Sequence, residues 1–216
     1  MENEIKLVGG AVLTLALATA AMIVVPFMQL KDVPPPAGLA PYTEQELRGR
    51  QVYIANGCIA CHTQQPSTIG AGRADAVRGW GRPSVAADYF HDRPTLLGTM
   101  RTGPDLFNVG DRIPSEDWHH VHLYQPRAYV PDSTMPAYPF LYETMVAVEV
   151  PPGQYTVPIP DAHAPRGRKV VPTRDAEDLV AYLKAMTRQY DVAEPLDAAA
   201  AKALASELRG RTRQED

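Results

Sequence analysis

The sequence predicts a mainly α-helical protein in which one N-terminal transmembrane helix is followed by a loop-rich domain. Three observations lead to this prediction: an uncharged stretch at residues 7–30, helical patterns at 43–55 and 175–190, and 21 prolines with 15 glycines among 216 residues. A long apolar stretch is typical of a membrane span, whereas frequent proline and glycine favour loops. We divide the chain into an anchor at 1–31, a proline-rich linker at 32–42, a domain at 43–192 and a tail at 193–216.

The uncharged stretch is bracketed by Lys6 and Lys31. As an α-helix it would be about 36 Å long, enough to cross a hydrocarbon core of about 30 Å. A cleaved signal peptide is the alternative, because Ala18-Thr19-Ala20 resembles a small-residue cleavage site. The apolar run continues beyond that site, and the residues before Lys6 lack a strongly positive region. We therefore expect a retained, single-pass anchor.

The next elements lead from the anchor to the domain. Prolines within residues 32–41 predict a semi-rigid, extended spacer, because proline fixes φ and excludes helix. Thr43 and Glu46 match a capping box at the start of the helix predicted for residues 43–55. This helix runs directly into Gly57 and Cys58.

Cys58-Ile59-Ala60-Cys61-His62 forms a C-x-x-C-H motif that contains both cysteines of the chain. The motif is the attachment signature of a c-type haem, whose vinyl groups bond the thiols while the histidine ligates iron. A thiol–disulfide pair would give no reason for His62, and a structural zinc site would need more ligands. We expect one covalent haem c, attached at Cys58 and Cys61, with His62 as proximal ligand.

The haem also indicates location. Because c-type haem is attached outside the bacterial cytoplasmic membrane, the domain should be periplasmic and the N-terminus cytoplasmic, in the bacterial inner membrane. The net charge of −4 gives no sign of nucleic-acid binding. No acid–base pair, nucleophile or open metal position is evident in the sequence, so we expect no catalysis by this chain alone.

A helix followed by C-x-x-C-H resembles the opening of the class I cytochrome c fold. The closing helix of that fold would be residues 175–190, where Leu179, Tyr182, Leu183 and Met186 form one apolar stripe. Met186 is therefore expected in the core. In cytochromes c a Gly-Pro-x-Leu segment passes the proximal histidine, and residues 103–106 match it. The carbonyl of Pro104 is thus expected to accept the proton of His62 Nδ1 and fix the ring.

Met135 is the expected sixth ligand. Pro131, Pro136 and Pro139 confine residues 130–140 to a stiff, irregular loop that can hold a thioether towards iron. The alternatives are Met100 as the ligand, or a Met135 that only packs against the haem. Arg101, next to Met100, could pair with a haem propionate or be an ordinary surface arginine.

Trp118-His119-His120-Val121-His122 lies in a short helix predicted at residues 116–124. His119 and His122 share a helix face while His120 does not, and no further partner completes a zinc or copper motif. We expect Trp118 to pack at the haem and the histidines to make hydrogen bonds or partner contacts. A bis-histidine haem using one of them is the main alternative to ligation by Met135.

In their order along the chain, the anchor and these motifs resemble the monohaem subunit II, of FixO type, of cbb₃-type haem–copper cytochrome c oxidases. The motifs that carry the resemblance lie at residues 57–64, 101–106, 118–127 and 135–139, and it covers about residues 1–142 and the C-terminal helix. It implies that His62 and Met135 are the axial ligands. It also implies electron transfer from a periplasmic donor cytochrome towards a separate b-haem and copper subunit that reduces O₂, beside another cytochrome c subunit.

The chain departs from that family in two segments. Residues 144–172 look inserted, and strands at 146–150 and 154–157 are expected to form a β-hairpin around Pro151-Pro152-Gly153. The basic loop at 166–169 that follows is expected to be solvated. Residues 65–70 differ from the usual sequence after the haem motif. The alanine-rich tail at 197–210 is expected either to form a helix or to fray.

Three other functions stay open at this point. The chain could belong to a nitric-oxide-reducing haem–copper complex, be a free-standing anchored electron shuttle, or be a haem sensor with an open sixth position. Small residues in the anchor, among them Gly9, Gly10 and Ala11, permit close helix contact and favour a subunit over a shuttle. A sensor would need Met135 to be free of iron.

Overall fold

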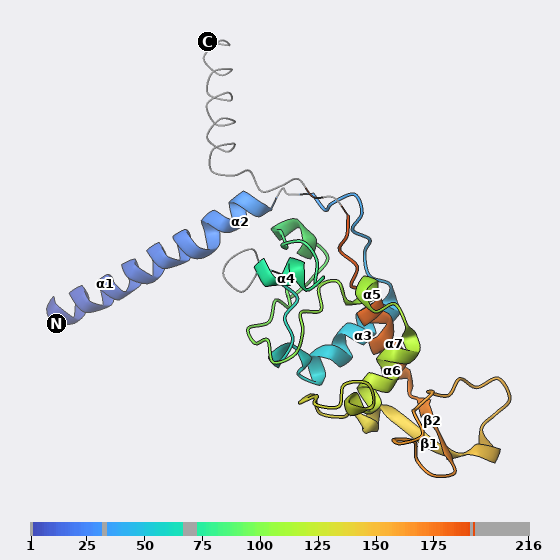
Figure 1. Ribbon diagram of the computed structural model, residues 1–216. Helices are drawn as coiled ribbons and strands as arrows, with labels where there is room; N and C mark the ends of the chain where they lie inside the picture. The colour runs from blue at the N-terminus through green and yellow to red at the C-terminus, as the bar shows by residue number, and fades with distance from the viewer. Residues whose placement is uncertain (1, 32–33, 67–72, 191, 193–216) are drawn as a thin grey trace.

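The computed structural model describes residues 2–31, 34–66, 73–190 and 192 (Figure 1). It is mainly helical with one small sheet, as the sequence predicts. The α-helices are α1 (Glu2–Thr19), α2 (Val25–Leu30), α3 (Glu44–Ala55), α4 (Arg73–Val77), α5 (Val109–Arg112), α6 (Glu116–Tyr124) and α7 (Arg174–Ala185). The strands are β1 (Tyr142–Val146) and β2 (Arg168–Pro172). The expected helix or fraying of residues 197–210 lies outside the described residues.

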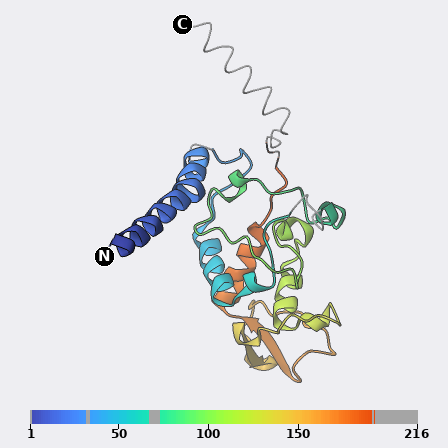
Figure 2. The same ribbon diagram turned by 90° about the vertical axis from the view of Figure 1, so that its left-hand side faces the viewer.

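The N-terminal helix is a candidate membrane span. The stretch Asn3–Gln29 has 27 residues, and its 18-residue apolar window has a mean hydropathy of 2.3 and is unburied in the protein. A π-helical segment, Ala20–Val24, joins α1 to α2 within it. Figures 1 and 2 both show this helix extending away from the domain, so its apolar side chains are free to contact lipid or another helix.

Two helices, α3 and α7, cross at the centre of the domain. An added β-carbon at Gly49 of α3 would overlap the backbone carbonyl of Asp178 on α7, so the helices are in backbone contact. Arg48 reinforces the crossing, because its Nε donates to the Asp178 carboxylate at 2.6 Å. Tyr53, Leu179 and Tyr182 are fully buried in the core. The crossing fixes the end of α3, where the C-x-x-C-H motif begins.

Side-chain caps define where these helices begin. Thr43 and Glu46 form the expected capping box at α3, where each side chain bonds the other residue's backbone N–H. Thr173 caps α7 by accepting from the backbone N–H of Ala176. Thr173 also donates to the carbonyl of Leu141 at 2.8 Å, which ties the start of α7 to the residue before β1.

The helix predicted for residues 175–190 ends earlier, at Ala185. The chain turns there because its backbone bonds another segment: Gly110 N donates to the Met186 carbonyl at 3.0 Å. Arg188 N donates to Asn108 Oδ1 at 2.6 Å. Met186 is only 1% exposed and belongs to the core, as expected from its apolar stripe.

The sheet differs in its pairing from the sequence prediction. A hairpin is present, but its strands are β1 and β2, paired antiparallel from Tyr142 opposite Pro172 to Val146 opposite Arg168. The expected strands at 146–150 and 154–157 do not pair with each other. Residues Ala147–Glu149 instead form a 3₁₀ turn, and Val157 bridges to Val170 of β2. Val170 and Val171 of β2 are buried. Burial of this strand therefore favours its pairing with β1, which the turn residues at 151–153 did not indicate.

The described part of the linker packs against the residues that follow α7. Gly38 leaves no room for a β-carbon against Tyr190, and the hydroxyl of Tyr42 accepts from Arg188 Nη2 at 2.8 Å. Residues 34–36 form no regular helix or strand, which is consistent with the proline-rich spacer. The linker is therefore held against the domain from Gly38 onwards.

Candidate cofactor site

A largely apolar pocket lies between the end of α3, α6, α7 and the loop that carries Met135. It contains about 610 Å³ of atom-free space, including the part open to solvent. Its lining includes Cys58, His62, Pro104, Arg112, Trp118, His119, His122 and Met135, together with apolar residues of the core. The pocket thus brings together residues from most of the motifs singled out in the sequence.

The C-x-x-C-H motif enters the pocket from the C-terminus of α3. Gly57 adopts the left-handed conformation at φ 66°, which favours glycine, and the chain then forms the 3₁₀ turn Cys58–Ala60. Cys58 lies in the pocket wall, whereas Cys61 is exposed. Burial raises the pKa of Cys58 to about 11. Its thiol is therefore protonated at neutral pH, unlike the low-pKa cysteines of thiol–disulfide enzymes.

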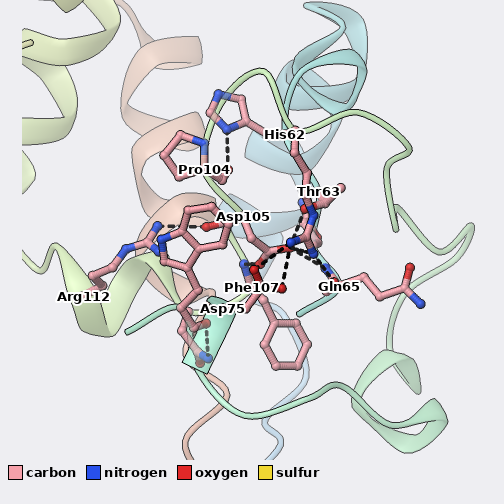
Figure 3. Close-up of polar contacts among 12 residues, drawn as sticks. His62, Thr63, Gln65, Asp75, Pro104, Asp105, Phe107 and Arg112 are labelled. Atoms are coloured by element: carbon pink, nitrogen blue, oxygen red, sulfur yellow. Dashed lines mark hydrogen bonds and ion pairs between the residues drawn. The ribbon is translucent and has the colours of Figure 1, made fainter. Parts of the chain in front are cut away.

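His62 is oriented by the segment that contains Pro104 (Figure 3). Its Nδ1 lies 2.7 Å from the Pro104 carbonyl oxygen, which is the contact expected from the sequence. An acceptor there places the proton on Nδ1 and leaves Nε2 free to act as a ligand. The ring also packs directly over Gly103, where an added β-carbon would overlap it. Burial lowers the pKa of His62, which favours its neutral form.

The buried carboxylate of Asp105 joins this segment to the residues after His62 (Figure 3). It accepts from the Thr63 hydroxyl at 2.5 Å and from the backbone N–H groups of Gln65 and Phe107 at 2.8 Å each. Burial raises the pKa of Asp105, and these three donors oppose the rise. The carboxylate fixes residues 63–65 against residues 105–107 and so helps to hold the preceding His62 against Gly103 and Pro104.

Met135 lies in the wall of the same pocket as His62. Its loop is held by one local and one longer-range hydrogen bond: Met135 N donates to Ser133 Oγ at 3.2 Å, and Tyr138 N donates to the Leu123 carbonyl of α6 at 2.9 Å. Met100, the rival, is 55% exposed and is not part of the pocket lining. Only Met135 of these two methionines can therefore face a group in the pocket.

The histidines of α6 point in two directions. His119 and His122 line the pocket with Trp118, as their shared helix face predicts. His119 Nε2 lies 2.9 Å from the Ile113 carbonyl. His120 faces away, with Nδ1 at 3.2 Å from the Tyr142 hydroxyl. Among the described residues, no group of three or more histidine, cysteine or acidic side chains is arranged to hold a metal ion.

The two arginines near the pocket have different environments. Arg101 Nη1 lies 2.7 Å from both carboxylate oxygens of Asp75, and its Nη2 donates to the Gln65 carbonyl at 2.9 Å. Arg112 lines the pocket and donates from Nη2 to the Asp105 carbonyl at 2.8 Å (Figure 3). Its Nη1 is buried and finds no acceptor among the described residues. Sequence reasoning missed Arg112, because no pattern separates it from the chain's other arginines.

These residues fit a haem group. The pocket offers an oriented imidazole, a thioether, a thiol in its wall and an apolar lining. The unpartnered Arg112 Nη1 offers a charged donor to a carboxylate, which a haem carries on its propionates. The fit depends on residues that lie far apart in the sequence.

Comparison with known proteins identifies one family for the chain. The sequence model of one family, described as cytochrome c oxidase, mono-haem subunit/FixO, matches residues 1–158. A comparison with curated proteins finds no match for the chain. The family match spans the apolar N-terminal helix, the C-x-x-C-H motif and the Met135 loop, and we conclude that the chain belongs to the FixO family of mono-haem cytochrome c oxidase subunits.

Proposed function

We propose that this chain is the electron-transfer subunit of a cbb₃-type oxidase and carries one covalent c-type haem. The observation that supports it best is the convergence of His62, Met135 and Cys58 on one apolar pocket. In this pocket a haem supplies one-electron transfer by cycling its iron between the ferrous and ferric states. Cys58 and Cys61 hold the group through thioether bonds.

The remaining residues bind and orient the group. His62 Nε2 and the Met135 sulfur would both bind the haem iron, with no need for a substrate to coordinate it. The Pro104 carbonyl holds the His62 ring by accepting from Nδ1. Trp118 would pack against the haem, and Arg112 Nη1 would donate to one of its carboxylates. Arg101, the arginine expected for this task, is already bound to Asp75 and is the weaker candidate.

The site's surroundings suggest its place in a complex. The apolar N-terminal helix anchors the chain in the bacterial inner membrane with its N-terminus in the cytoplasm, and the domain lies in the periplasm. Electrons come from a periplasmic donor and pass towards a b-haem and copper subunit that reduces O₂, beside another cytochrome c subunit. The anchor carries Gly9 and Gly10, where nothing fills the space of a β-carbon, which supports close packing with a partner helix.

Co-purification from native membranes through a C-terminal tag tests the proposal. The expected result is a complex that contains a b-haem and copper subunit, has one covalent haem on this chain, and consumes O₂. Consumption of nitric oxide without O₂ uptake would instead assign the chain to a nitric-oxide-reducing complex. Purification alone, with haem but no partner, would make it a free-standing anchored shuttle.

Covalent attachment needs a separate test on the same protein. Haem should stay with the polypeptide after denaturation and acid extraction. Cys58→Ser and Cys61→Ser should each leave a single thioether and lower the haem yield, whereas the double variant should lose covalent haem. Haem that is extracted from the native chain would contradict the c-type assignment while leaving the family membership intact.

A further inference from the structure

Three aromatic rings form a path from the pocket wall to the surface. The rings of Trp118 and His122, one turn apart on α6, have centroids 4.5 Å apart and planes inclined by 12°. The ring of Tyr129 is also inclined by 12° to that of Trp118, with centroids 6.1 Å apart. Trp118 and His122 line the pocket, while Tyr129 is 41% exposed. The stack therefore forms a continuous series of aromatic rings from the pocket to the solvent.

Backbone bonds hold the outer ring in place. After α6 the chain forms the 3₁₀ turn Pro126–Ala128. Tyr129 N and Val130 N both donate to the Pro126 carbonyl, at 3.3 and 3.1 Å. Ser133 N donates to the Val130 carbonyl at 2.9 Å, and this leads into the loop of Met135. Tyr129 thus stands at the base of the loop that carries the proposed sixth ligand.

A second aromatic group starts at the pocket but has a different course. Tyr53 lines the pocket and meets Tyr182 edge-on, at 63°, and Tyr182 meets Tyr42 at 52°. Tyr42 ends this group in the linker, where Arg188 donates to its hydroxyl. Tyr53 and Tyr182 are fully buried. This group leads into a hydrogen bond with Arg188 and presents no near-parallel ring to a partner.

We propose that the stack of His122, Trp118 and Tyr129 is the electron port of the domain, through which the haem exchanges electrons with a protein one-electron carrier. The proposal rests on the proposed function. One electron passes between the haem iron and the carrier's metal centre, so one is oxidised as the other is reduced, and no bond forms or breaks. The rings are positioning residues that provide close electronic contact between the pocket and the surface at Tyr129.

Photo-triggered electron transfer within the labelled full-length holoprotein tests the port. A ruthenium complex is attached to a single added thiol, either by Arg127→Cys beside Tyr129 or by Gln51→Cys on α3; both native residues are exposed. Flash excitation then gives the rate of haem reduction from each label. With the label at 127, Tyr129→Leu should slow the rate several-fold, and Tyr129→Phe, which keeps the ring, should restore it.

The controls separate a port from a structural role. With the label at 51, neither Tyr129 variant should change the rate, and the haem spectrum and midpoint potential should be the same in all variants. Phe140→Leu removes another exposed ring, which contacts Tyr138 at 65° and does not line the pocket, and it should leave both rates unchanged.

Two results would overturn the proposal. The first is an unchanged rate from the label at 127 in Tyr129→Leu. The second is an equal loss from both labels, because this would reflect a change at the haem. If neither label transfers an electron to the haem in the labelled protein that keeps Tyr129, the proposed electron-transfer function is overturned as well. The two failures are therefore distinguishable.

Discussion

Gly49 of α3 lies directly against the backbone carbonyl of Asp178 on α7, with no space for a β-carbon between the helices. The adjacent Arg48 donates to the carboxylate of the same Asp178. Since the C-x-x-C-H motif begins three residues beyond α3, this contact sets where the motif lies relative to α7. A backbone contact between residues that do not themselves line the pocket therefore helps to set the geometry of the pocket.

Gly49→Ala should destabilise the domain. The added methyl group must push α3 away from α7, and overpacking of this kind typically costs about 1–3 kcal/mol. Denaturant unfolding of the haem-bound protein, followed by haem absorbance, measures the change. Gln51→Ala, at an exposed position of the same helix, is the control and should leave the unfolding midpoint within error. An unchanged midpoint for Gly49→Ala would show that the helices can separate at little cost.

Met135→Leu should leave haem covalently attached but remove the absorption band that methionine sulfur gives in the ferric state. Met100→Leu is the matched control, because Met100 is exposed and outside the pocket, and it should keep the band. If Met100→Leu loses the band and Met135→Leu keeps it, Met100 is the iron ligand and Met135 is not. A native spectrum without any sulfur band would instead point to a histidine ligand, for which His122 and His119 line the pocket.

Asp88→Asn should weaken the fold at neutral pH but not in acid. The carboxylate is buried, which by itself raises its pKa, but donors from Arg82, the Val85 backbone and Tyr190 outweigh burial and hold the pKa below its ordinary value of 3.8. A depressed folded-state pKa stabilises the fold above about pH 4, and this contribution is lost as pH falls through the folded-state value.

The loss at pH 7 should be about 1–3 kcal/mol, as expected when buried donors lose a charged acceptor. Parallel unfolding curves of native protein and Asp88→Asn between pH 7 and pH 3 measure it. The two curves should converge as the pH falls. A difference in stability that stays constant across this range would mean that the ionised carboxylate contributes nothing through its charge.

Arg112→Gln should lower the haem midpoint potential, because a nearby cation favours the reduced, more electron-rich iron. Arg101→Gln should change the potential less, since Arg101 is paired with Asp75 and lies outside the pocket lining. Redox titration of both variants in the same buffer gives the comparison. A larger change in potential for Arg101→Gln than for Arg112→Gln would instead indicate that Arg101, the residue that the sequence first suggested, pairs with the propionate.

The helices and motifs that carry their own local signals were predictable from the sequence. Thr43 and Glu46 mark the start of α3 by a capping box, and the bounds of α6 agree with the predicted helix at 116–124. The stripe that contains Met186 placed this methionine in the core. In each case the decisive interactions lie within one helix or one turn, so residue order is enough to reveal them.

Features that depend on distant partners were not predictable. The end of α7 at Ala185 is set by bonds with residues 108–110, and the sheet forms between β1 and β2 rather than between the expected strands at 146–150 and 154–157. Arg101 and Arg112 look equivalent in the sequence, yet only the structure shows which has a free, buried donor. The parallel alignment of Tyr129 with Trp118 likewise depends on the turn after α6.

The packing of the linker limits how far the domain can move from the N-terminal helix. Because Gly38 and Tyr42 are held against Tyr190 and Arg188, the tether between α2 and this contact is no longer than residues 31–37. The distance from Leu30 to Gly38 along a fully extended chain is at most about 29 Å. With this helix in a membrane, so short a tether would confine a bound haem to a thin layer above it and raise its effective concentration towards neighbours in the bilayer. Exchange with a subunit of the same complex would then be intramolecular, and its rate would not depend on how much of either protein the membrane contains.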